Sequence, residues 1–158
     1  MKSTAVWIDT KQAKFVVWDG RRISSHIMHS GTERKPRVEG EKSKKGRRGI
    51  TGFDFESTQR ARFVEEFKKY LRSVVRELAG SNYVYLLGPS DTKLKLEKEI
   101  KRDNRVSPAI LSVESCDSMS DNQLTEKVIA FFRGRLERKP PAPRRRLPPQ
   151  GVRTPYRP

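Results

Sequence analysis

The chain has 158 residues, a formal net charge of +16 and only 34% hydrophobic residues, which suits one small domain with strongly basic extensions. Its single cysteine, Cys116, excludes an internal disulfide and a cysteine-rich zinc site, and no stretch approaches the roughly 18 apolar residues of a membrane span. The apolar run after Met1 is interrupted by Asp9 and is too short for a secretion signal, so we expect a soluble, cytoplasmic protein that is monomeric when free.

Three short β patterns occupy the first 30 residues. Thr4–Asp9 and Lys14–Trp18 are β-branched and aromatic runs separated by a short polar segment. The dipeptide Asp19-Gly20 is a strong turn signal, and Arg22–Met28 follows it as a third strand. The sequence therefore predicts an antiparallel meander.

A basic loop insertion is predicted over residues 30–56. This stretch shows no apolar periodicity and contains several glycines. Residues 32–52 alone carry eight Lys or Arg against three Glu, so the loop concentrates positive charge.

The next element is a long helix predicted from Ser57 to Ala79, because its apolar residues recur at helical spacing. Ser57 or Thr58 is expected to cap its start, and Gly80 stands where a helix-terminating glycine belongs.

The remaining elements alternate between strand and helix. Tyr83–Leu87 and Ala109–Val113 are strand patterns. A second helix is expected from Ser90 or Asp91 to Lys101. A third extends to Leu136, after a capping box formed by Ser120 and Gln123.

The order βββ-α-β-α-β-α predicts an α/β, ribonuclease H-like fold over residues 1–136. Its mixed five-stranded sheet should consist of an antiparallel meander followed by parallel strands, with about three helices. Residues 137–158 are predicted to form a flexible Pro/Arg-rich tail, in which 138–158 hold seven Lys or Arg and no acidic residue.

Three short motifs resemble a translation family. Tyr83–Lys93 contains a strand followed by Gly-Pro-x-x-x-Lys and a helix, and Arg62-Phe63 lies near the start of the long helix. These two motifs resemble the middle domain of archaeo-eukaryotic class I release factors and Pelota. Val6–Asp9, together with Ala13-Lys14-Phe15, is similar to the start of the small bacterial release-factor-like (host attachment) proteins. The resemblance covers residues 4 to about 136 and implies a partner in translation.

The catalytic Gly-Gly-Gln of that family has no counterpart. Aligning Arg62-Phe63 with the family's Arg-Phe places Glu56-Ser57-Thr58 where the paired glycines would fall. Peptidyl-tRNA hydrolysis in the family depends on those glycines, so we expect no release activity, no cofactor and no small-molecule substrate.

The charge distribution and the resemblance together favour a non-enzymatic, ribosome-associated protein that binds rRNA or tRNA. It would be a hibernation or stress factor, an accessory factor, or a stably bound ribosomal component. The residues expected to contact RNA share a basic or aromatic side chain in the loop, the first helix or the tail. They are Arg34, Lys35, Arg37, Lys42, Lys44, Lys45, Arg47 and Arg48 in the loop; Arg60, Arg62 and Lys69 in the helix; and Arg138, Lys139, Arg144, Arg145, Arg146, Arg153, Tyr156 and Arg157 in the tail.

Two alternatives remain open. Asp9, at the end of the first strand, together with Asp91 and Asp117 could hold Mg²⁺ in a ribonuclease H-like nuclease or hydrolase. His26 and His29 would point to opposite faces of a strand and do not make a metal pair. Alternatively, the proline-rich tail could bind a protein partner and make the chain an adaptor.

Overall fold

The structure, a computed structural model, describes residues 1–32 and 52–138, with side chains in the second range from residue 57 onward. The basic stretch 33–51 and the tail 139–158 lie outside the described residues, and so do the RNA contacts predicted there. No helix in the described ranges has the length and apolar character needed to cross a bilayer.

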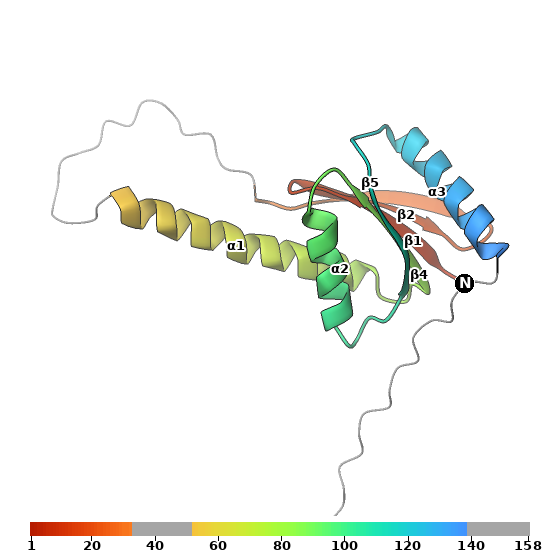
Figure 1. Cartoon of the computed structure of the whole chain (residues 1–158), viewed down its shortest axis with the longest axis horizontal. Helices are drawn as coiled ribbons and strands as arrows, with labels where there is room; N and C mark the ends of the chain where they lie inside the picture. The colour runs from red at the N-terminus through yellow and green to blue at the C-terminus, as the bar shows by residue number, and fades with distance from the viewer. Residues whose placement is uncertain (33–51, 139–158) are drawn as a thin grey trace, which may run out of the picture.

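The described strands form one mixed sheet (Figure 1). Its strands are β1 (Ser3–Ile8), β2 (Gln12–Trp18), β3 (Ile23–His29), β4 (Tyr83–Gly88) and β5 (Ala109–Ser115), in the spatial order β3-β2-β1-β4-β5. The β1–β2 and β2–β3 pairs are antiparallel, and the β1–β4 and β4–β5 pairs are parallel. This arrangement confirms the predicted α/β, ribonuclease H-like fold.

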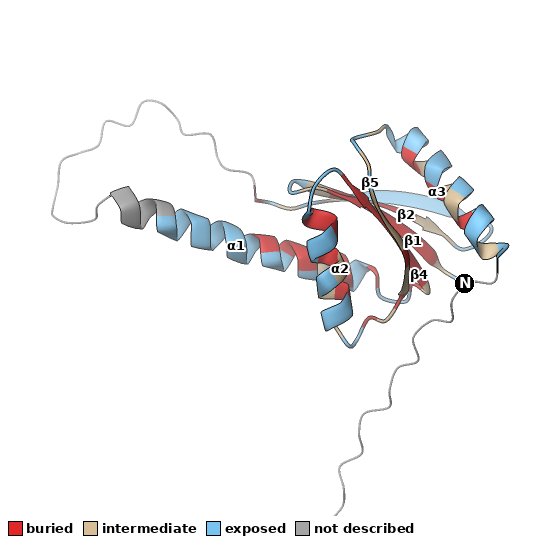
Figure 2. Ribbon diagram, in the orientation of Figure 1, coloured by how far each residue is buried: buried red, intermediate tan, exposed pale blue. Residues whose placement is uncertain are grey.

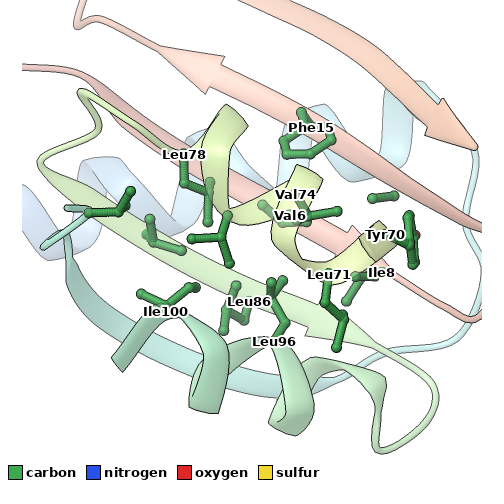
Figure 3. Packing of buried hydrophobic residues seen from close by; sticks show 14 of the residues in the cluster. Val6, Ile8, Phe15, Tyr70, Leu71, Val74, Leu78, Leu86, Leu96 and Ile100 are labelled. Atoms are coloured by element: carbon green, nitrogen blue, oxygen red, sulfur yellow. The ribbon is translucent and has the colours of Figure 1, made fainter. Parts of the chain in front are cut away.

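The helices cover the two faces of the sheet. They are α1 (Gly52–Glu77), α2 (Thr92–Arg102) and α3 (Asp121–Leu136). Because side chains alternate along a strand, Val6 and Ile8 of β1 pack against α1 and α2, whereas Ala5 and Trp7 pack against α3. Figure 3 shows the first of these two cores, where α1 and α2 lie over the sheet.

The prediction that α1 starts at Ser57 is wrong, because the helix begins at Gly52. The five additional residues contain no proline, and they include Asp54 and Glu56, acidic residues that the positive end of a helix dipole favours. At the other end, Gly80 has a φ of +81°, the left-handed conformation expected of a glycine that terminates a helix.

The predicted caps of the other two helices differ in outcome. The capping box of α3 is confirmed, with Ser120 and Gln123 exchanging side-chain and backbone hydrogen bonds. Asp91 occupies the N-cap position of α2, but its side chain makes no capping hydrogen bond.

The side chains of α1 that the structure describes pack on the domain only from Phe67 onward. Within its described side chains, every residue from 57 to 66 is exposed, whereas the core-facing residues from Phe67 onward are buried (Figure 2). The first half of the helix therefore projects beyond the body of the domain.

Candidate nucleic-acid interface

Four of the residues predicted to contact RNA lie in the described part of the chain. Arg60, Arg62 and Lys69 are on α1, and Arg138 follows α3. All four are exposed. The described part of the predicted interface therefore lies mainly on α1.

A row of cations runs along the outer side of α1. Arg62, Lys69 and Arg76 follow one another at intervals of seven residues, which is close to two helical turns and about 10 Å along the axis. The buried residues of the same helix, such as Leu71 and Val74, repeat on the opposite side. The three side chains consequently point away from the core, and we call Arg62, Lys69 and Arg76 the α1 cationic row.

These cations are not neutralised by contacts. Among the described residues, none of the three makes an ion pair; the acidic Glu65 pairs instead with Lys68 at 3.4 Å, and Glu77 faces His26 at 3.2 Å. An exposed cation without a protein partner keeps its full charge for an anion. The row can therefore contact phosphates without first breaking an interaction within the described structure.

The structure separates Arg60 from this row. Arg60 precedes the buried Phe67 by seven residues, so it lies on the apolar side of the helix, near the exposed Val64. The sequence prediction of RNA contacts on α1 includes Arg60 and does not include Arg72 or Arg76, both of which are exposed. The seven-residue interval counted from Arg62 would have identified Arg76.

The Gly-Pro-x-x-x-Lys motif has a structural role in this chain. A Cβ atom at Gly88 would overlap the carbonyl oxygen of Ile8, so the end of β4 can approach β1 only with glycine. Lys93 is buried, with only 6% of its surface exposed. Its side chain folds back, and its amino group donates a hydrogen bond of 2.8 Å to the carbonyl of Ser90. This lysine therefore helps to close the β4–α2 loop.

Asp9 also has a local structural role. Its Oδ1 accepts hydrogen bonds from the backbone N–H groups of Lys11 and Gln12, at 2.7 and 2.8 Å, in the β1–β2 turn. The carbonyl of Asp117 accepts a hydrogen bond from the Trp7 indole. Within residues 1–32 and 52–138, no three His, Cys, Asp or Glu side chains gather in a way that could hold a metal ion.

The packed half of α1 is attached to this same turn. The Tyr70 hydroxyl donates a hydrogen bond of 3.3 Å to the carbonyl of Asp9. Burial raises the pKa of Tyr70 well above its usual value, and the Asp9 carboxylate raises it further. The C-terminal part of the cationic row thus lies on the half of α1 that packs against the sheet and α2.

The molecule is therefore a mixed-sheet α/β domain whose described part presents cations along a partly projecting helix. No protein-family model matches the sequence, and no curated protein matches it significantly. Among solved structures, the chain is similar to the Pelota protein of Thermoplasma acidophilum, with a TM-score of 0.49 and 14% identity over 82% of this chain and 32% of that chain. It is also similar to the archaeal translation termination factor aRF1, with a TM-score of 0.41 and 12% identity over 84% of this chain and 39% of that chain. The chain spans only about a third of the length of these proteins, and the likeness is one of fold outline alone.

Proposed function

We propose that this protein is a non-enzymatic RNA-binding component of the translation machinery that associates with the ribosome through rRNA or tRNA. The observation that carries the proposal is the α1 cationic row, whose members are exposed and make no ion pair in the described structure. The two basic stretches of the sequence and its motif resemblance to a translation family support the same partner. Such a protein would act as a hibernation or accessory factor, or as a stably bound ribosomal component.

The row suits a phosphate backbone better than a small ligand. Its three cations are about 10 Å apart along one line, which fits the extended negative charge of a nucleic acid strand. Each phosphate contact releases condensed counterions, so binding that depends on the row should weaken steeply as salt increases.

The test measures the salt dependence of binding to a fluorescently labelled ribosomal RNA helix. In the variant Arg62→Gln/Lys69→Gln/Arg76→Gln, we expect the slope of log K against log salt to fall by about 3, roughly one for each lost phosphate contact. Affinity at low salt should fall by about tenfold or more. RNA recovered from the wild-type incubation with Mg²⁺ should be intact.

A matched control removes the same charge elsewhere. Lys11→Gln/Arg21→Gln/Arg22→Gln changes three exposed cations near the β1–β2 and β2–β3 turns. If both triple variants lose affinity and slope equally, net charge and not the α1 cationic row determines binding. Absence of the protein from the ribosomal fractions of a low-salt sucrose gradient would contradict the ribosomal part of the proposal.

A further inference from the structure

β3 forms one edge of the sheet and lacks the usual protection of an edge strand. Edge strands expose unpaired N–H and C=O groups, and proteins commonly protect them with lysine, proline or β-bulges. The seven residues of β3 include no Lys, Arg, Asp, Glu or Pro, and all seven pair with β2 without a register shift. In the part of the chain that the structure describes, no strand pairs with the outer side of β3.

The backbone groups on the free edge belong to alternate residues. The N–H of Asp19 donates to the carbonyl of Arg22, and the N–H of Ser30 donates to the carbonyl of Lys11, so hydrogen-bonded pairs close both ends of the β2–β3 ladder. Hydrogen-bonded and non-bonded pairs alternate in an antiparallel ladder. The set that bonds to β2 is Ser24, His26 and Met28, and the set that points its N–H and C=O outward is Ile23, Ser25, Ile27 and His29.

The outward set also carries exposed apolar side chains. Ile23 pairs with Trp18, which packs against the α3 core, and Ile27 pairs with Lys14, which binds Asp121 of α3 at 2.8 Å. Both isoleucines therefore lie on the α3 face of the sheet, yet they remain 43% and 45% exposed. α3 does not extend far enough to cover them.

We propose that β3 pairs with β3 of a second copy of this chain, antiparallel and centred on Ser25, to form one continuous sheet. This register places Ser25 opposite Ser25 of the partner subunit. It also places Ile23 opposite Ile27 of the partner subunit, and the two-fold symmetry repeats this pair with the roles of the two copies exchanged. Every residue in these pairs directs its backbone groups toward the other copy, as hydrogen bonding across the two-fold axis requires.

Side-chain matching and charge favour a second copy in this register. Shifting it by two residues would place Ile23 opposite His29 of the partner subunit and lose the matched isoleucine pairs. The centred register also places Arg21, two residues before the strand, opposite His29 of the partner subunit, so the arginines of the two copies do not oppose each other. Cross-strand apolar pairs stabilise such ladders, and opposed like charges destabilise them.

The assembly has a consequence for the α1 cationic row. A two-fold axis perpendicular to the sheet keeps the α1 and α2 layers of both copies on one face and both α3 helices on the other. The two cationic rows would then lie on the same side of the dimer. Pairing requires no RNA, so the dimer can be tested separately from the proposed function. A dimer differs from the monomer that the sequence leads us to expect.

Sedimentation equilibrium of the full chain tests the pairing. A single edge ladder buries less surface than a standard interface, so we expect a weak dimer whose mass rises from one chain toward two between about 5 and about 500 μM protein. Ile27→Lys and Ile23→Lys should each remain monomeric over the same range with unchanged circular dichroism. Leu94→Lys is the matched control, because it changes a 44% exposed apolar residue on α2 and should leave the dimer intact.

Hydrogen exchange tests whether the free edge of β3 is the surface that pairs. The amides of Ile23, Ser25 and Ile27 should gain protection as protein concentration rises, while those of Ser24, His26 and Met28 should be protected at every concentration. A single-chain mass throughout, or equal loss of the dimer in Leu94→Lys, would overturn the proposal. Constant protection of all six amides in monomeric protein would also overturn it, because the edge would then be covered within one chain.

Discussion

The two halves of α1 differ in what surrounds them, although one pattern of residues runs through both. Between residues 57 and 66 every side chain is exposed, whereas Tyr70, Leu71 and Val74 are buried against the sheet and α2. The α1 cationic row begins in the projecting half with Arg62 and continues into the packed half.

The apolar stripe of the helix likewise extends beyond the core. Phe63 stacks on Phe67 at a ring distance of 6.0 Å, yet Phe63 is 39% exposed while Phe67 is buried. On the packed side, Lys95 of α2 lies 5.4 Å from the Phe67 ring. Most helical stability in proteins comes from tertiary packing. The packed half of α1 is therefore stabilised by its neighbours, whereas the projecting half depends mainly on its own hydrogen bonds.

The largest expected effect is in native-state hydrogen exchange along α1. Amides near Val74 and Val75 should exchange only through global unfolding, whereas those of residues 60–66 should exchange through local fraying at least about 100-fold faster. Mass spectrometry with overlapping peptides would resolve the two halves. Uniform protection from residue 60 to residue 77 would show that the projecting half is covered in solution.

A matched pair of substitutions tests the same difference in stability. Val74 is fully buried and Val64 is 45% exposed, and both are in α1. Val74→Ala should lower the free energy of unfolding by about 2 kcal/mol, because it removes two buried methyl groups and leaves a cavity. Val64→Ala should change it by less than about 0.5 kcal/mol. Equal losses, measured by urea unfolding, would contradict the division of the helix.

The smallest expected effect concerns alkaline pH. The raised pKa of Tyr70 means that the folded protein keeps this phenol protonated while the unfolded chain ionises it near pH 10. Its contribution to stability is therefore complete below about pH 10 and is lost as pH rises further. Tyr70→Phe should cost about 1 kcal/mol at neutral pH, where it removes the hydrogen bond to the Asp9 carbonyl.

The difference between wild type and Tyr70→Phe should then shrink above pH 10. Tyr85 stays in both proteins as an internal reference, because burial and the Glu114 carboxylate raise its pKa in the same way. A constant difference in urea midpoint from pH 8 to about pH 11 would show that Tyr70 does not titrate differently on unfolding.

Local sequence signals were sufficient for most of the fold. The turn at Asp19, the glycine at position 80 and the capping box at Ser120 each fix backbone conformation over a few residues, and each is found in the structure. The start of α1 was missed because residues 52–56 carry no apolar repeat, although nothing in them terminates a helix. Apolar periodicity predicts a helix from the residues that recur on one face, so it gives no signal in a segment that lacks the repeat.

The candidate interface was predictable only in part, for a similar reason. The density of positive charge predicts RNA contacts in the basic loop and the tail. These contacts stay predictions, because residues 33–51 and 139–158 lie outside the described residues. The cationic row follows from the seven-residue interval of its members, on the side of α1 opposite the apolar repeat. How far along the helix that apolar side is covered depends on contacts with α2 and the sheet, which are distant in sequence. Lys93 shows the opposite case, since a motif lysine that resembles a family signature folds back onto the Ser90 carbonyl.

The register that pairs Ser3 with Tyr83 has a consequence for synthesis of the chain. β1 finds its antiparallel neighbour β2 within a few residues, but its parallel neighbour β4 is 80 residues later. At translation rates of about 5–20 residues per second, the second side of β1 waits about 4–16 seconds for its partner. During that interval the central strand of the finished sheet is an edge. We therefore expect the nascent meander to be the stage of biogenesis most vulnerable to misassembly.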